Sequence, residues 1–386
     1  MVVGRKRVAS ALVAAGVAVV ASGCYVGVDP SGGTEAYMPT DSGSGTADDG
    51  GDDGDDGPGD GPDDGPDDGP GDGPDDGPDD GPDDGPDDGP DDGPDDGPDD
   101  GPGDGTTGTM DDDTGGSDEA EQMCMRWQSD RVDLGEGTWS GSVASCNAGD
   151  ISADGRTNAL RLVNLYRWLA DLPEVTDDGG LNASAQACAL MMDANNSLSH
   201  NPPMSWACYS GSGASSAGAS NISTGPGVMS VDMYMVDFGN ASTLGHRRWI
   251  LSNSLGPIGL GSTSGSSCMQ VIGGNGNANA DWTAFPPPGT FPYEMFDILP
   301  FGDPLDQTGW SIQSDSMDLG GAQVTITSDG VDRPVSLTTL GAGYGSSSAI
   351  SIIPQGWSTQ PDTTYHVEVT GVGQPFSYDV DIVDCG

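Results

Sequence analysis

The chain has 386 residues and a formal net charge of −51, because 62 acidic residues stand against 11 basic ones. This length is enough for one or two domains with tails, and a field of this sign repels phosphate backbones, which argues against a nucleic-acid partner. About half of the acidic residues lie between Asp48 and Glu121, so the charge belongs mainly to one segment.

Residues 1–24 have the pattern of an export signal. Arg5-Lys6-Arg7 gives a basic start, and the apolar run from Val8 to Val20 is shorter than the roughly 20 residues that a membrane-spanning helix needs. Small residues then lead to Cys24, an order that resembles the bacterial lipobox. The resemblance implies cleavage before Cys24 and a diacylglycerol group on its sulfur. The alternative is an ordinary signal peptide with an incidental cysteine.

We therefore expect membrane attachment through a lipid anchor at Cys24, since two or more acyl chains hold a protein stably in a leaflet. Tyr25, rather than an aspartate, follows the cysteine and favours sorting to the outer membrane. The expected location is the cell envelope, with the folded part surface-exposed or extracellular.

Residues 25–121 are predicted to be a long disordered acidic linker. From about Gly57 to Gly105 the unit Asp-Asp-Gly-Pro repeats, which leaves almost no apolar surface to bury. Regular proline favours polyproline II, and at about 3.1 Å per residue such a stalk can extend on the order of 150 Å. The alternative role is a diffuse association with cations, because the repeat lacks the ligand spacing of a specific calcium-binding loop.

A domain of mixed helices and strands is predicted for residues 122–275. Apolar residues at three- and four-residue spacing predict a helix over about 157–171, capped by Asp154 or Thr157. The further expected elements are a helix at 182–196, a loop at 210–229, a short helix at 231–238, and a hairpin of strands at 258–261 and 268–272.

A second domain is predicted for residues 276–386, after a shift in composition near Gly276. Short segments with strand-like alternation are separated there by turn residues at regular intervals. The expected strands are 322–327, 335–338, 349–353, 365–370 and 377–383. This pattern predicts a small antiparallel β-sandwich of immunoglobulin-like type. His366 lies within one of the strands and is interpreted as a surface or edge residue.

Six cysteines follow Cys24, namely Cys124, Cys146, Cys188, Cys208, Cys268 and Cys385. An even number in an exported chain predicts three disulfides, whose pairing the sequence leaves open. Cys124 and Cys146 suggest a disulfide-closed N-terminal extension, and Cys385 could be joined to Cys268 or to another part of its domain. The chain has no Cys-x-x-Cys pair, which argues against a zinc ribbon or a thioredoxin-type site.

Between residues 157 and 272, several short motifs follow one another in a definite order. They are Asn164 with Arg167, Leu181-Asn182, Gln186, Ala189, Met192, Asn196-Ser197-Leu198-Ser199-His200, Ser220-Asn221-Ile222, Gly245-His246-Arg247 and Ile258-Gly259-Leu260-Gly261. In this order and spacing they resemble the CAP superfamily, which comprises cysteine-rich secretory proteins, insect antigen 5, plant pathogenesis-related 1 proteins and many bacterial members. The resemblance implies a CAP-type α-β-α sandwich with a central cleft, so an α+β protein is expected.

In that family, two histidines and two acidic residues typically line the cleft, and some members bind a divalent metal there. His200 and His246 match the two histidines. Ser220, followed by Asn221, stands where the family has its first acidic residue. The second acidic residue falls near Asp237, with Asp232 as the alternative. The resemblance therefore implies a cleft that has lost one carboxylate.

Two histidines and a carboxylate brought together by a fold make a candidate site for zinc or a similar metal, with His200, His246 and Asp237 as ligands. The structural alternative is that His200 ends a helix through a hydrogen bond and that His246 pairs with a carboxylate. Arg247-Arg248 could bind an anionic group, but we expect this pair to bond acidic neighbours in so acidic a protein.

The favoured function is non-enzymatic, and no residue is assigned a catalytic role. Because relatives include sterol and lipid binders, the resemblance implies binding of a hydrophobic, lipid or cell-envelope ligand, or of a protein partner, in or near the cleft. The first alternative is a metal-dependent hydrolase that uses the two histidines and Asp237. The chain has no Gly-x-Ser-x-Gly, Walker or Rossmann motif. The second alternative is an adhesive or structural envelope protein that makes contact through the β-sandwich.

Overall fold

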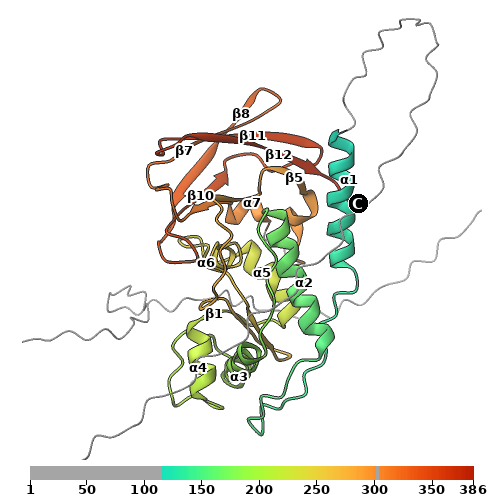
Figure 1. The fold of residues 1–386 in the computed structure, drawn as a ribbon, viewed down its shortest axis with the longest axis vertical. Coiled ribbons are helices and arrows are strands. Elements are labelled where there is room, and N and C mark those ends of the chain that lie inside the picture. Colours follow the sequence, from blue (N-terminus) through green and yellow to red (C-terminus); the bar gives the residue numbers. More distant parts are fainter. Residues whose placement is uncertain (1–114, 301–303) are drawn as a thin grey trace, which may run out of the picture. The chain divides into compact units, whose positions relative to one another are not determined.

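The computed structural model describes residues 115–300 and 304–386 (Figure 1). The export signal, Cys24 and almost all of the expected linker lie outside these residues, and the predictions for them stay predictions. Helix α1, Gly115–Arg131, begins inside the expected linker, so residues 115–121 are helical. The repeat has ended by then, and the sequence that follows is free of proline and rich in good helix formers. No helix among the described residues is long and apolar enough to cross a membrane.

Residues 115–275, which we call the helical region, contain a three-stranded antiparallel sheet between helices. After α1, its elements are α2 Ala153–Leu169, α3 Gly179–Asn195, α4 Gly211–Gly218, β1 Ser220–Ser223, α5 Gly227–Val236, α6 Gly245–Ile250, β2 Gly259–Ser262 and β3 Ser267–Gln270. The strand order is β1-β3-β2. The fold is therefore α+β, and the expected helices and hairpin are present with ends shifted by a few residues.

Helices cover both faces of this sheet. Successive side chains of a strand point to opposite faces, so neighbouring residues pack against different helices. Cys268 packs in one apolar cluster with residues of α3 and α4, whereas the next residue, Met269, belongs to the cluster that holds α2 and α5. Helix α3 lies very close to β2, since a Cβ atom on Gly261 would stand 2.1 Å from the main chain of Ala185. This close approach explains why glycine occupies the strand at that position.

The prediction of a loop over residues 210–229 was wrong. That segment contains α4, β1 and the start of α5. Its Gly, Ser and Ala content indicates close packing rather than a loop, because a Cβ atom on Gly213 would lie 2.9 Å from the main chain of Ala187 in α3. The hydroxyl of Ser210 caps α4 by accepting the Gly213 N–H at 3.1 Å. The residue at the N-cap position of α2 is Ser152, rather than Asp154 or Thr157, and its side chain makes no capping hydrogen bond.

Residues 276–386, which we call the β region, contain two sheets. The elements are β4 Thr283–Phe285, β5 Gly289–Pro292, the short 3-10 helix η1 Tyr293–Asp297, α7 Leu305–Thr308, β6 Trp310–Ser314, β7 Gln323–Ser328, β8 Val331–Arg333, β9 Val335–Thr339, β10 Ser348–Pro354, β11 Thr363–Thr370 and β12 Phe376–Val383. The sheet orders are β4-β6-β10-β9 and β5-β12-β11-β7-β8. All five expected strands are present, and every pair is antiparallel except β5 with β12. His366 is exposed on β11, a central strand rather than an edge.

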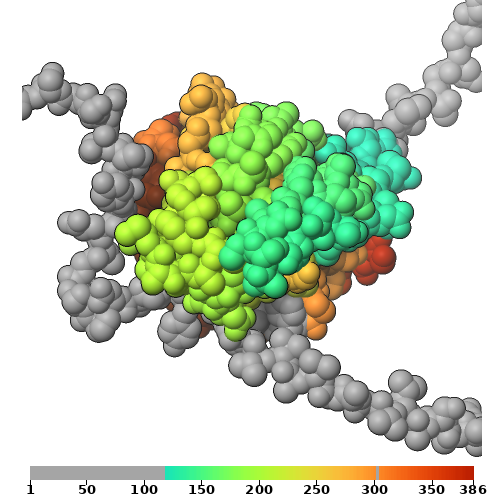
Figure 2. Space-filling model, turned by 90° about the horizontal axis from the view of Figure 1, so that it is seen from below, coloured from blue at the N-terminus to red at the C-terminus, as the bar shows by residue number. Residues whose placement is uncertain are grey.

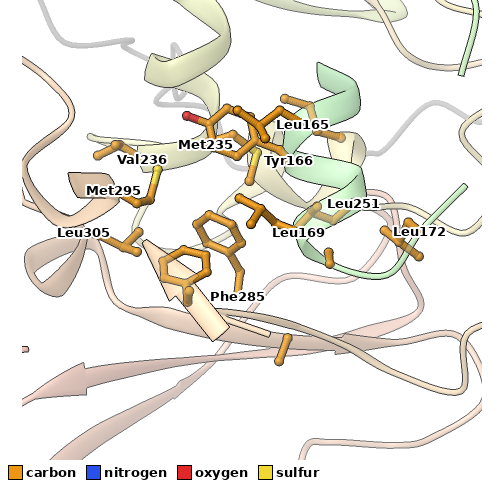
Figure 3. Close-up of a cluster of buried hydrophobic side chains, with 14 of the residues drawn as sticks. Leu165, Tyr166, Leu169, Leu172, Met235, Val236, Leu251, Phe285, Met295 and Leu305 are labelled. Carbon is orange, nitrogen blue, oxygen red and sulfur yellow. The ribbon is translucent and has the colours of Figure 1, made fainter. Parts of the chain in front are cut away.

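One hydrophobic core runs from the helical region into the β region. Figure 3 shows its centre, where Leu165, Tyr166, Leu169, Met235 and Val236 of the helices meet Phe285, Met295 and Leu305 of the β region. In the space-filling view of Figure 2, residues of the helical region in teal, green and yellow-green form most of the visible face, directly against the orange of the β region. The two regions are thus packed together rather than joined by a free connection.

The predicted three disulfides are confirmed, and the structure decides their pairing. They are Cys124–Cys385, Cys146–Cys208 and Cys188–Cys268. The expectation that the first two of these cysteines close the N-terminal extension was wrong. Helix α1 instead packs along β5, and this brings Cys124 to the C-terminal end of the chain. The chain is therefore covalently closed from α1 to its last residues.

Candidate functional site

The two candidate histidines come from segments that the fold brings together. His200 follows α3, and its Nδ1 atom lies 2.9 Å from the carbonyl oxygen of Ala217 in α4. His246 is in the first turn of α6. Loss of solvation around the ring lowers the pKa of His200, the Ala217 carbonyl raises it, and charge on His246 lowers it further.

Asp237 orients the ring of His246. This residue ends α5 in the left-handed conformation, with φ of 59°, and its side chain is fully buried. One carboxylate oxygen accepts from His246 Nδ1 at 2.8 Å and from Asn240 Nδ2 at 2.7 Å, and the other accepts the main-chain N–H of Arg247 at 3.3 Å. Since Asp237 accepts from Nδ1, the neutral ring of His246 has an unprotonated Nε2.

Neighbouring polar groups hold the main chain of His246 in place. Asn221 is buried, and its side-chain amide donates to the carbonyl oxygen of His246 at 3.1 Å. The ring of Tyr234 lies 5.1 Å from the imidazole, and its hydroxyl donates to the Asn221 carbonyl at 3.2 Å. Asn221 thus helps to fix the main chain of His246. The hydroxyl of Ser220 is also buried and donates to the carbonyl of Ser216 at 2.6 Å.

Asp232, the alternative acidic residue, belongs to a separate cluster. Its carboxylate accepts two hydrogen bonds from the guanidinium of Arg131, at 3.0 and 2.6 Å, and one from the hydroxyl of Tyr166. Burial, together with the Asp232 carboxylate, raises the pKa of Tyr166 well above its ordinary value. The guanidinium also lies 4.8 Å from the ring centre of Trp127. This cluster fastens α1 to α2 and α5, and the carboxylate beside His246 is that of Asp237.

Comparison with protein families finds one match. The model of the "CAP: Cysteine-rich secretory protein family" matches residues 160–272. These residues are a CAP domain. They span α2 through β3 and include both candidate histidines. Comparisons with curated proteins and with solved structures gave no match. The CAP domain and the three disulfides indicate a secreted or extracellular protein.

His200, His246 and Asp237 make a poor set of metal ligands. Among residues 115–300 and 304–386, no group of three or more His, Cys, Asp or Glu side chains is arranged to hold a metal ion. Both oxygens of Asp237 already accept hydrogen bonds, and Ser220 supplies no carboxylate. The residues therefore do not fit a site with three protein ligands, and we derive no chemical step through a metal.

The arginines after His246 do not bond acidic side chains as expected. All five N–H groups of Arg247 donate at 2.6–3.1 Å, to the carbonyls of Met235, Val236 and Gly309 and the hydroxyls of Thr308 and Ser311. Arg248 donates to the carbonyls of Thr243, Gly341 and Ser346 and to the Ser346 hydroxyl. Burial lowers the pKa of both arginines to about 10, so both stay charged at neutral pH. We call Arg247 and Arg248 the arginine clamp, because each bonds both regions.

The β region also reaches the residue next to His246 through Tyr344, which sequence reasoning missed. A Cβ atom on Gly245 would lie 2.8 Å from Cδ1 of Tyr344, so the ring rests on the residue before His246. Arg248 holds the same loop between β9 and β10. No local pattern could have linked Tyr344 to His246, because the two are far apart in the sequence. Asn240 was missed as well, although its position between Asp237 and His246 is a weak signal.

Proposed function

We propose that the protein is a surface-anchored, secreted CAP-domain protein whose cleft binds a ligand without chemical conversion. The observation that carries this proposal is the state of Asp237, which is buried and hydrogen-bonded to three donors. Its carboxylate fixes the ring of His246, and Ser220 supplies no second carboxylate where the family has one. What remains is a polar cleft with two imidazoles, suited to hydrogen bonding with a bound molecule.

The ligand that we favour is hydrophobic, such as a lipid or another apolar molecule of the cell envelope. A protein partner is the alternative ligand. Two exposed aromatic side chains support this choice. Phe238 follows Asp237 and is 45% exposed, and Tyr344 on Gly245 is 38% exposed. Apolar rings beside a polar cleft match a ligand with a hydrocarbon part and a polar head.

The test uses the full chain and the fluorescent fatty acid cis-parinaric acid. We expect saturable binding that falls about threefold or more in Phe238→Ala and in the double variant His200→Ala/His246→Ala. His366→Ala is the matched control, because this exposed histidine lies on β11 and should leave binding unchanged. Absence of saturable binding would contradict the hydrophobic ligand class.

Zinc titration of the same proteins separates binding from the hydrolase alternative. We expect no stoichiometric zinc binding at micromolar metal. Ser220 stands in place of one carboxylate, and the other carboxylate, that of Asp237, already accepts hydrogen bonds on both oxygens. Stoichiometric binding that disappears in His200→Ala would overturn this proposal in favour of a metal site.

We further infer that the chain is attached to the outer membrane through Cys24 and that the β region is an immunoglobulin-like sandwich. The lipobox-like order before Cys24 supports the first inference, and the two sheets of short strands support the second. Metabolic labelling with palmitate, compared with a Cys24→Ala variant, tests the anchor. Labelling that persists in the variant would contradict it.

A further inference from the structure

A groove in the β region lies apart from the CAP cleft and has no role in the function proposed above. It has a volume of about 590 Å³. Its lining comes from three loops and strand ends, and consists of Asp281, Trp282, Ser316, Met317, Asp318, Gly373, Gln374, Pro375 and Phe376. The volume is within the roughly 300–1,000 Å³ of typical ligand pockets.

The floor of the groove is a stack of aromatic rings. The rings of Trp282 and Phe376 are nearly parallel, with centroids 4.3 Å apart, and Tyr378, two residues after Phe376 on β12, has its centroid 5.2 Å from that of Trp282. Trp282 and Phe376 are half-buried, whereas Tyr378 is buried. Because the rings cover one another, the stack can offer a ligand only an outer face, which makes it a flat platform and not an enclosure.

The main chain around Trp282 is fixed on both sides. The carbonyl oxygen of Asp281 accepts hydrogen bonds from the hydroxyls of Ser314, at 2.6 Å, and Ser316, at 3.3 Å. Thr283 is paired with Gln313 in the β4–β6 ladder. A ring held in this way loses little freedom when a ligand packs on it, and this favours binding.

The rim of the groove carries hydrogen-bonding groups but no basic ones. Asp281 and Asp318 are exposed, and the carboxylate of Asp281 has no hydrogen-bond or ion-pair partner within residues 115–300 and 304–386. Gln374 adds an amide and Ser316 a hydroxyl. Carboxylates accept strong hydrogen bonds from hydroxyl groups, and they repel anions.

From the platform and this rim, we propose that the groove binds a neutral oligosaccharide. One apolar C–H face of a sugar ring packs on Trp282, while its hydroxyls donate to Asp281 and Asp318 and bond with Gln374. Anionic polysaccharides are rejected by the two carboxylates. An organic cation is less well matched, because cation recognition uses several ring faces around the charge and the stacked rings present one.

The test is affinity electrophoresis of the full chain in gels that contain a soluble neutral polysaccharide, namely mixed-linkage β-glucan, xylan or galactomannan, or the acidic polygalacturonate. We expect retardation in at least one neutral gel and none in polygalacturonate. Trp282→Ala should lower the affinity by about tenfold or more. Trp282→Phe should keep part of it, and Trp168→Ala, which removes a comparably exposed tryptophan from α2, should leave it unchanged.

Asp281→Asn tests the site with a variant that should not disturb folding, since weaker binding by Trp282→Ala could also come from misfolding. This side chain is exposed and without a partner, so the variant should fold normally and still bind about threefold more weakly or worse. The proposal is overturned if no neutral gel retards the chain, or if Trp282→Ala and Asp281→Asn both migrate as wild type does. Binding of polylysine that vanishes in salt, in place of sugar binding, would overturn it in favour of a cation site. His200→Ala should not change retardation, which separates this site from the CAP cleft.

Discussion

Replacing Arg247 should reveal how strongly the CAP domain depends on the β region. Arg247→Met leaves three buried carbonyls and two hydroxyls without their donor. Each unsatisfied buried carbonyl costs about 1–3 kcal/mol, and removal of the buried charge returns several kcal/mol of desolvation. We expect a net loss of about 3 kcal/mol or more, a large part of the roughly 5–15 kcal/mol that stabilises a typical domain.

Arg247→Lys isolates geometry from charge. Lysine keeps the positive charge but has three donors in place of five, so at least two of the bonds are lost and the free energy of unfolding should fall by about 2–4 kcal/mol. Arg333→Lys is the matched control, because this half-buried arginine on β8 bonds one hydroxyl, that of Ser328. It should cost less than about 1 kcal/mol.

The assay is urea unfolding followed by tryptophan fluorescence, with disulfides intact. We expect wild type to unfold in one transition, because the core and the arginine clamp join both regions. Arg247→Met should lower the midpoint or split the transition in two. An Arg247→Met variant that unfolds in one step within about 1 kcal/mol of wild type would refute the reasoning, since five buried hydrogen bonds would then contribute nothing net.

Three further predictions concern other parts of the chain. Glu136→Ala should cost about 1 kcal/mol in urea unfolding, because its carboxylate accepts the N–H groups of Val228 and Met229 in the first turn of α5, at 2.7 and 2.8 Å. The double variant Cys124→Ser/Cys385→Ser opens a 261-residue loop and should lower stability by about 5 kcal/mol on the chain-entropy model, measured by thermal unfolding. Because the pKa of His200 lies below its unfolded value of 6.5, protonation favours the unfolded chain, so stability that is present above the unfolded pKa is lost as the pH falls below it toward the lower pKa of the folded chain. His200→Gln should reduce this loss between pH 7 and 5, and NMR titration should show a higher pKa for His200 in His246→Ala.

Periodic burial is what made much of the fold predictable from sequence. Helix α2 buries one side, and strands β7, β11 and β12 bury alternate residues, and that regularity is visible in the sequence. The loop prediction for residues 210–229 was wrong because small residues are typical both of loops and of tightly packed helices. The pairing of Cys124 was not predicted because nothing in the sequence near it indicates that α1 packs beside the C-terminal end of the chain.

The candidate site divides in the same way. The motif resemblance predicted His200 and His246 as site residues, and this stays a prediction. Of the two carboxylates that it offered as alternatives, that of Asp237 is the one bonded to His246. Long-range partners were beyond sequence reasoning. In the β region, Arg247 donates to one carbonyl and two hydroxyls that lie some sixty residues downstream. No sequence pattern marks these groups as partners of an arginine. The expectation that the side chains of Arg247 and Arg248 bond acidic neighbours rested on charge alone and was wrong.

The Gly-His-Arg segment links the cleft to the β region through adjacent residues. The ring of His246 is bonded to Asp237, and the next residue, Arg247, makes three of its five side-chain hydrogen bonds to the β region. Asp237 accepts from both residues, through the ring of one and the main-chain N–H of the other. Removing residues 276–386 would therefore expose the core around Leu165 and leave a buried arginine charge short of acceptors. Such a truncation should unfold the CAP domain rather than report on the β region alone, so point variants on the full chain are the informative way to separate the two sites.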